Sequence, residues 1–198
     1  INFKNKKIFF LLAENNYEFV LIYFVLLKKK YPFFLIDKNI NKKNLKNLIE
    51  KFSPNYILSK EKKLLNLKFS KKFLNFNIFN NSNKNYNINK NLCLLLPTSG
   101  STGSPKFVML SRQNILKNTK DICKYLKLNK NNITISTLPF HYSYGLSILN
   151  THIYAGSKII FSKYNIMSKE FWRLFNKKKI NSIYGVPQSF EILKKLRF

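Results

Sequence analysis

The sequence predicts an α/β fold with a mostly parallel sheet that helices cover on both faces. Short apolar runs suited to strands alternate along the chain with longer segments of helical periodicity, the order typical of a parallel sheet. The first two runs, 8–12 and 33–36, are apolar at every position, as in strands buried on both sides. The 198 residues are 45% hydrophobic and 16% aromatic, enough apolar surface for one sizeable folded domain.

Residues 1–59 are expected to form a βαβαβ unit. Its first helix is apolar on almost every side, which predicts a buried helix. In its second helix apolar residues recur every three or four positions from Leu45 to Phe52, and Pro54 stops the pattern. The expected order is strand 8–12, helix 15–29, strand 33–36, helix 45–52 and strand 56–58.

Residues 60–91 are expected to form a surface excursion rich in Asn and Lys. Nine of the seventeen residues from Asn75 to Asn91 are Asn, which favours turns and cannot supply a core. The aromatic residues expected to hold this excursion against the domain are Phe73, Phe76 and Phe79.

Residues 92–198 continue the alternation and contain a polar loop between two apolar runs. Ser111 follows the second run and is suited to cap the helix after it. The expected strands are 92–96, 107–110, 133–138, 158–161 and 182–184. One expected helix begins after Ser111, and the others span 144–154, 169–178 and 188–197.

The formal net charge of +28 would ordinarily indicate a nucleic-acid or membrane partner. Of the 36 basic residues, however, 33 are Lys, and these are interleaved with 28 Asn instead of lining one stripe. Arg, whose guanidinium group makes bidentate hydrogen bonds to phosphate and guanine, occurs only three times. We therefore expect no specific nucleic-acid partner, and a basic nucleic-acid-binding domain is kept as the alternative from another class of protein.

The cysteines and the apolar runs indicate a reduced, cytoplasmic chain. Cys93 and Cys123 lack a Cys-x-x-Cys spacing, so neither a zinc site nor a disulfide framework is well supported, and no metal ligand is assigned. The longest apolar run, 19–27, has nine residues, about half of what a membrane helix needs. The first and last residues both look like cut ends, so we expect a piece of a longer protein.

The polar loop after the strand at 92–96 has the composition of a phosphate cradle. It contains two of the five glycines, which can take positive φ and let backbone N–H groups close on an anion. Hydroxyl side chains add donors, and a lysine adds a full positive charge. It is not a Walker A loop, and from residue types alone it could also be a polar hairpin rich in turn formers. The loop reads Thr98-Ser99-Gly100-Ser101-Thr102-Gly103-Ser104-Pro105-Lys106.

In this order the loop resembles the phosphate-loop signature of the adenylate-forming superfamily, which includes acyl-CoA synthetases, acyl-AMP ligases, luciferases and adenylation domains of peptide synthetases. All nine positions match. A second region, from Leu138 through His141 to Gly145 and on to the Gly156 turn, is similar to the family in order and spacing. A third and weaker likeness lies at 184–187, similar to the family's turn before the adenine-binding segment.

The resemblance implies roles for individual residues. His141 would lie beside the acyl carboxylate and the α-phosphate, and Gly145 would leave room for the acyl group. Lys106 would hold the departing pyrophosphate, and Lys106 and His141 are the expected catalytic residues. His152 is expected to be structural. The residues implied in ATP binding are Thr98, Ser99, Gly100, Ser101, Thr102, Gly103 and Lys106.

The resemblance also implies an activity: ATP-dependent activation of a carboxylic acid as an acyl-adenylate, followed by thioester formation with coenzyme A. An alternative acceptor is the phosphopantetheine of a carrier protein. Residues 1–198 would then be an incomplete AMP-binding N-terminal domain, with 92–198 as its phosphate-loop and acyl-pocket segment. The family's Tyr-Gly-x-Thr-Glu segment for Mg²⁺, its ribose-binding Asp and its C-terminal Lys have no counterpart here, so the isolated chain is expected to be inactive.

Overall fold

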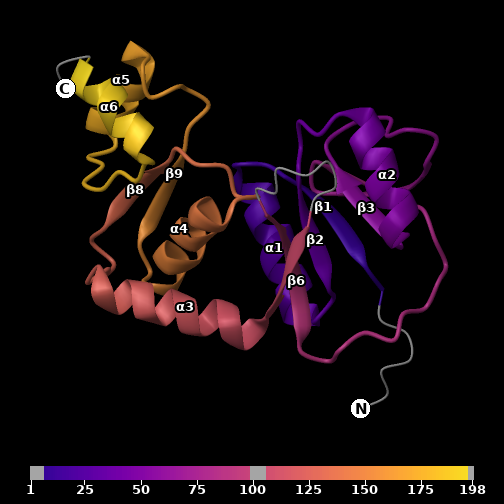
Figure 1. Cartoon of the computed structure of the whole chain (residues 1–198). Coiled ribbons are helices and arrows are strands. Elements are labelled where there is room, and N and C mark those ends of the chain that lie inside the picture. Colours follow the sequence, from indigo (N-terminus) through magenta and orange to yellow (C-terminus); the bar gives the residue numbers. More distant parts are fainter. Residues whose placement is uncertain (1–6, 99–105, 196–198) are drawn as a thin grey trace. The chain divides into compact units, whose positions relative to one another are not determined.

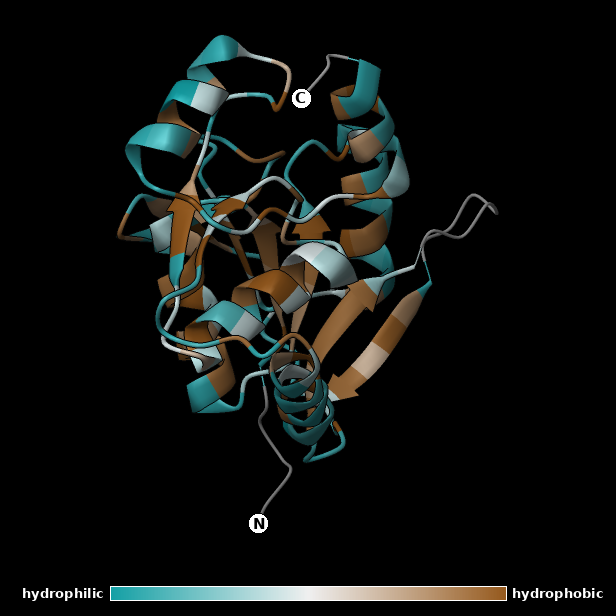
Figure 2. Ribbon diagram, turned by 90° about the vertical axis from the view of Figure 1, so that its left-hand side faces the viewer, coloured by the Kyte–Doolittle hydropathy of each residue, from teal (hydrophilic) through white to brown (hydrophobic). Residues whose placement is uncertain are grey.

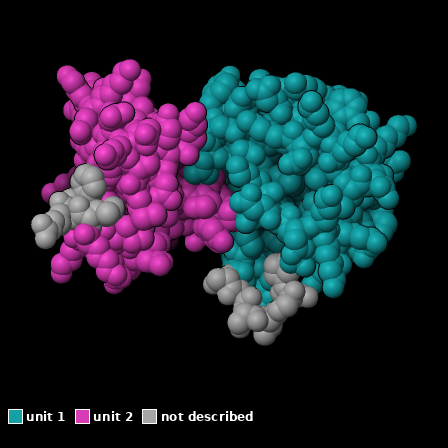
Figure 3. Space-filling model, turned by 90° about the horizontal axis from the view of Figure 1, so that it is seen from above, with its two compact units in different colours: residues 1–115 teal, residues 116–198 magenta. Residues whose placement is uncertain are grey.

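The computed structural model describes residues 7–98 and 106–195 (Figure 1). The chain divides into two compact units, residues 1–115 and 116–198, which Figure 3 distinguishes by colour. Within the described residues the strands form one sheet of seven strands and one of two. Each unit is described by itself below.

Unit 1 is built on the seven-stranded sheet, in the order β4-β5-β3-β1-β2-β6-β7. Its centre, β3-β1-β2-β6, is parallel, and antiparallel partners extend it on both sides. The expected α/β fold with a mostly parallel sheet is therefore confirmed, in a mixed sheet. The strands are β1 (Phe9–Ala13), β2 (Phe33–Asp37), β3 (Tyr56–Ser59), β4 (Lys68–Phe73), β5 (Phe76–Asn80), β6 (Leu92–Pro97) and β7 (Phe107–Ser111).

The helices α1 (Tyr17–Lys29) and α2 (Lys42–Phe52) cover opposite faces of this sheet. The connection from β1 to β2 and the one from β2 back past β1 to β3 run in opposite directions, and right-handed crossovers then place their helices on opposite sides. Neighbouring residues of β2 show the result. The Phe33 ring meets Tyr23 of α1 edge-on at 5.7 Å, whereas Phe34 belongs to the core cluster that contains Leu45 of α2.

The hydropathy of the elements accounts for this arrangement. Figure 2 shows hydrophobic strands beside helices that mix hydrophobic and hydrophilic residues. Abundant Asn also contributes locally, because Asn16 and Asn41 cap α1 and α2 by accepting from the backbone N–H groups of Phe19 and Asn44 at 2.9 and 2.8 Å. No helix within 7–98 and 106–195 is long and apolar enough to cross a membrane.

The excursion expected over 60–91 needs correction, because β4 and β5 form a hairpin that belongs to the sheet. β5 pairs antiparallel with β3, and the Phe76 and Phe79 side chains are buried, as expected for residues that hold this segment, whereas Phe73 is exposed. Alternation of Asn with apolar residues over 75–80 is a strand pattern, and the turn-forming character of Asn obscured it. Residues 81–91 contain no helix and no strand beyond a single bridge.

Unit 2 is built on a two-stranded parallel sheet, β8 (Ile133–Ser136) and β9 (Lys158–Phe161). Beside it Ile135, Phe171 and Ile180 form a buried cluster. Helix α3 (Arg112–Tyr125) begins at the end of unit 1 and continues into unit 2. The other helices of unit 2 are α4 (Ser143–Tyr154), α5 (Lys169–Lys177) and α6 (Pro187–Lys195).

The strand expected at 182–184 is reduced to one bridge, between Thr134 and Ser182. Side chains add to the backbone hydrogen bonds that Asn181 and Ser182 donate to the Ile133 carbonyl. The Ile133 N–H donates to the Asn181 side chain at 2.9 Å, and the Ser182 hydroxyl donates to the Ile133 carbonyl at 3.2 Å. The position of this segment therefore depends in part on polar side chains, whose contacts cannot be read from the apolar pattern of the sequence.

Candidate functional site

Thr98 and Lys106 close the mouth of the hairpin formed by β6 and β7. The Thr98 N–H donates to the Lys106 carbonyl at 2.9 Å, and the Thr98 hydroxyl lies 3.3 Å from the same oxygen. Pro97 pairs with Phe107 directly behind them. The two ends of the expected phosphate loop are thus held together by the sheet. The expected phosphate-binding residues between them, which lie outside the described residues, are Ser99, Gly100, Ser101, Thr102 and Gly103.

The loop leaves the sheet at the carboxyl end of β6, which is parallel to β2. Ligands of open α/β sheets bind outside the carboxyl ends of the strands. Lys106 is exposed at this edge. A lysine so placed can meet an anion held by the loop without first losing its own hydration in the core.

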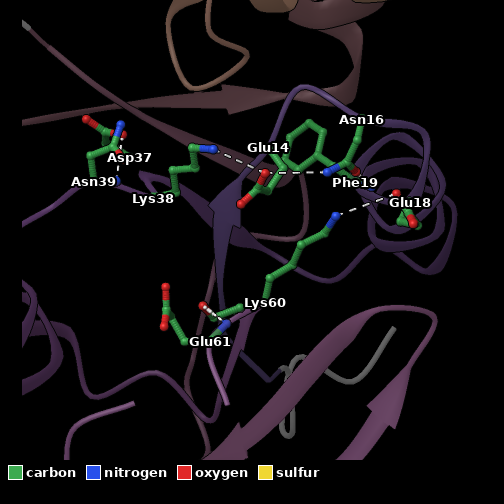
Figure 4. A network of polar contacts seen from close by, with 10 residues as sticks. Glu14, Asn16, Glu18, Phe19, Asp37, Lys38, Asn39, Lys60 and Glu61 are labelled. Carbon is green, nitrogen blue, oxygen red and sulfur yellow. Dashed lines mark hydrogen bonds and ion pairs between the residues drawn. The ribbon is translucent and has the colours of Figure 1, made fainter. Parts of the chain in front are cut away.

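A polar network that the sequence analysis did not predict lies at the carboxyl ends of β1 and β3 (Figure 4). Lys38 pairs with Glu14 at 3.3 Å, and Lys60 pairs with Glu18 at 3.8 Å. The Asn75 side chain donates to Glu18 at 2.7 Å, and this bond, a backbone hydrogen bond and Lys60 lower the pKa of Glu18. The signal available in the sequence was that Glu14 and Lys60 each lie two residues beyond an expected strand.

His141 lies in the turn between β8 and α4 of unit 2. Its side chain is buried, with 6% exposed, and its ring centroid is 4.1 Å from that of Tyr142. The Tyr142 N–H donates to the Pro139 carbonyl at 3.2 Å, and the Phe140 ring packs edge-on against Phe161. The expected site histidine is therefore held in a fixed turn.

Gly145 lies in the first turn of α4, where the backbone leaves no room for a side chain. A Cβ at this position would lie 2.2 Å from the Pro139 carbonyl oxygen and 2.8 Å from its carbon. The missing side chain thus lets α4 approach the turn that carries His141. Room for an acyl group at Gly145 stays a prediction, and the structure supplies a packing reason for the same glycine.

The N-terminus of α4 begins directly after His141 and Tyr142. Tyr142 is its N-cap residue and makes no side-chain cap hydrogen bond. Uncapped N–H groups at a helix start favour an anion. Sequence reasoning missed this feature because it began the helix at 144, with Ser143 before it, whereas α4 begins at Ser143 and its N-cap is Tyr142.

The residues expected to form the site fall into two groups. Thr98 and Lys106 come together in unit 1, and His141 and Gly145 lie in one turn-and-helix segment of unit 2. A family model described as AMP-binding enzyme matches residues 1–197. The chain belongs to the AMP-binding enzyme family. The resemblance read from the loop and the His141 region is thereby confirmed.

Curated and solved members of the family agree with this. The chain is 32% identical over 106 residues to the acyl-CoA ligase sidI of Aspergillus fumigatus, an alignment that covers 52% of this chain and 18% of that protein. It superposes with a TM-score of 0.73 and 15% identity on o-succinylbenzoate CoA synthetase (MenE) of Bacillus subtilis bound to the acyl-adenylate OSB-AMP, covering 97% of this chain and 52% of that one. On ATP-bound MatB of Rhodopseudomonas palustris it superposes with a TM-score of 0.71 and 16% identity, covering 96% of this chain and 41% of that one.

These structures share the fold of this AMP-binding enzyme. At 15–16% identity the likeness concerns the course of the chain, not the substrate. The chain spans about half the length of MenE.

Proposed function

We propose that the protein activates a carboxylic acid with ATP, forming an acyl-adenylate and releasing pyrophosphate. One observation carries this proposal: a chain of the AMP-binding family has the complete Thr98–Lys106 loop sequence, with both ends held at the carboxyl edge of its parallel sheet. MenE, solved with an acyl-adenylate and also with ATP and magnesium, supports this choice of nucleotide.

The loop would act on the phosphates by electrostatics. Backbone N–H groups freed by the two glycines, the hydroxyl side chains and Lys106 can hold the β- and γ-phosphates while charge grows on the departing pyrophosphate. The attacking carboxylate is already a nucleophile, so the protein needs to supply neither nucleophile nor base in this step. Thr98 and Lys106 are joined through the backbone, which holds the two ends of the loop sequence together.

His141 and the start of α4 would act on the acid. A buried imidazole can donate one hydrogen bond to a carboxylate or phosphate oxygen, and the uncapped N–H groups of α4 favour the same negative charge. Gly145 allows α4 to lie against the His141 turn. We assign to His141 the orientation of the acid and to Gly145 the shape of this pocket.

Coenzyme A is the proposed acceptor, because the curated relative sidI carries the name acyl-CoA ligase. A carrier-protein phosphopantetheine is the alternative, and both are thiols that displace AMP from the adenylate. Magnesium would enter with ATP. The described residues contain no cluster of three or more His, Cys, Asp or Glu that could hold a metal ion, so this part of the chain offers no ligand set and no step is assigned to the ion.

Acid-dependent exchange of labelled pyrophosphate into ATP tests the proposal in the full-length protein that carries these residues. Lys106→Ala should raise the KM for ATP about 10- to 100-fold, since it removes charge-assisted phosphate contacts worth about 1.5–3 kcal/mol. His141→Ala should instead raise the KM for the acid or lower kcat at saturating ATP. Lys117→Ala, which removes an exposed lysine of α3, is the matched control.

The acid is identified by offering straight-chain, dicarboxylic and aromatic acids in turn. An unchanged ATP dependence in Lys106→Ala would show that the loop does not hold the phosphates. Absence of exchange with every acid would refute acid activation itself.

A further inference from the structure

The segment 181–186 runs from β8 toward α6 with few regular strand contacts. At Asn181 and Ser182, backbone and side-chain hydrogen bonds with Ile133 hold it beside β8. Two residues further on, the Thr137 hydroxyl donates a hydrogen bond to the Tyr184 carbonyl at 2.6 Å. A short hydroxyl-to-carbonyl bond fixes the backbone at the point where the chain turns into α6.

His152 holds the same residue from another element. Its ring is fully buried in α4 and meets the Tyr184 ring edge-on, with centroids 5.3 Å apart. The ring is oriented by its own helix, because Nδ1 lies 2.9 Å from the Ile148 carbonyl oxygen and must carry the proton to donate there. Burial lowers the pKa of His152, which agrees with a neutral ring at this position.

The Thr137 hydrogen bond and the His152 ring contact lie on either side of His141 in the sequence. Thr137 directly precedes the turn that carries His141, and His152 lies on α4, the helix that follows that turn. Tyr184 is therefore attached to both ends of the His141 segment, once through its backbone and once through its ring. A shift of the 182–186 segment would be transmitted to His141 from both sides.

We propose that Thr137 and His152 are positioning residues that clamp the 182–186 segment to the His141 turn and thereby fix His141 for its work on the acid. The catalytic consequence rests on the proposed function, whereas the clamp itself does not. Neither residue needs to touch a substrate, since both act through Tyr184 and the backbone.

Hydrogen exchange of backbone amides in residues 1–198 tests the clamp without any activity. Thr137→Val keeps the shape of the side chain and removes its donor, so amides of 182–186 should exchange about three- to tenfold faster, the factor of one neutral hydrogen bond. Thr137→Ser should restore the wild-type rate. His152→Ala should speed the same amides, and His152→Phe, which keeps a ring against Tyr184, should not.

Pyrophosphate exchange in the full-length protein tests the consequence. Thr137→Val should raise the KM for the acid about three- to tenfold and leave the KM for ATP unchanged, and Thr137→Ser should restore it. A merely structural role would instead speed exchange throughout 116–195 or alter both KM values, and either result overturns the proposal. Unchanged exchange at 182–186 in Thr137→Val also overturns it. If the wild type activates no acid, the proposed function fails, and the amide rates still decide whether the clamp exists.

Discussion

Replacing Gly145 by alanine should destabilise unit 2 although the position is helical. Alanine is the best helix former, and on propensity alone this substitution would stabilise α4 by about 1 kcal/mol. The structure indicates the opposite result, because the new Cβ would lie 2.2 Å from the Pro139 carbonyl oxygen and 3.0 Å from that of Leu138. Both obstacles are backbone atoms, so no change of side-chain rotamer can relieve the contact.

The size of the effect follows from these two terms. Overpacking of a tight site costs about 1–3 kcal/mol, and a backbone obstacle belongs at the upper end of that range. After subtraction of about 1 kcal/mol for helix propensity, Gly145→Ala should lower the free energy of unfolding by about 2 kcal/mol. Gly156 is the informative comparison, since its φ of +67° disfavours alanine while no atom lies within 4 Å of its Cβ position. Gly156→Ala should cost only about 1 kcal/mol.

Urea unfolding followed by fluorescence measures this difference directly. Trp172 is the single tryptophan of the chain and packs against the buried cluster of unit 2, with its indole N–H donating to the Ile166 carbonyl at 2.8 Å. Its emission therefore reports on the unit that contains α4. A Gly145→Ala protein as stable as the wild type, or more stable than Gly156→Ala, would refute the steric account and with it the close approach of α4 to the His141 turn.

Three further predictions concern pH, charge and completeness. Burial lowers the pKa of His152, so the neutral ring contributes fully to stability above the unfolded pKa of about 6.5. As the pH falls below that value, the free energy of unfolding should decrease by at most about 1.4 kcal/mol per pH unit. Urea titrations with Trp172 as probe should show this slope, and His152→Phe should flatten it. Duplex DNA should bind weakly, with strong salt dependence and no sequence preference, and a tenfold preference between two unrelated duplexes at physiological salt would contradict this. Residues 1–198 alone should bind ATP weakly in calorimetry without acid-dependent exchange, because the family's magnesium, ribose and C-terminal lysine residues are missing from the sequence; turnover within tenfold of the full-length protein would contradict it.

The central strands and helices were predictable because their apolar patterns have one physical solution. Strands with continuous apolar runs, such as Phe9–Ala13 of β1 and Phe33–Ile36 of β2, need cover on both faces, which helices on opposite sides provide. The β4–β5 hairpin was missed because its turn-forming Asn residues alternate with buried Phe76 and Ile78. The Asn-rich composition there predicts turns, whereas the apolar residues predict a strand. The structure follows the apolar residues.

The site was predictable to a different extent in its two parts. Residue order alone identified the Thr98–Lys106 loop, because glycines are scarce in this chain and the order is specific to a family that the chain is now shown to belong to. The surroundings of His141 were less predictable, since they depend on contacts between residues 32 and 47 positions apart in sequence. A hydroxyl such as that of Thr137 looks the same in a sequence whether it faces water or holds a distant carbonyl.

This difference has a consequence for how activity should respond to substitution. The Thr98–Lys106 contacts are local and backbone-based, so side-chain changes in the loop should alter phosphate binding without moving the sheet. The His141 turn is instead fixed by packing, through Gly145 against Pro139 and through Tyr184 against His152. Substitutions far from the acid should therefore alter its binding more readily than substitutions far from the loop alter the binding of ATP. Paired KM values for both substrates across variants of unit 1 and unit 2 would reveal this asymmetry, and equal sensitivity of the two would argue against it.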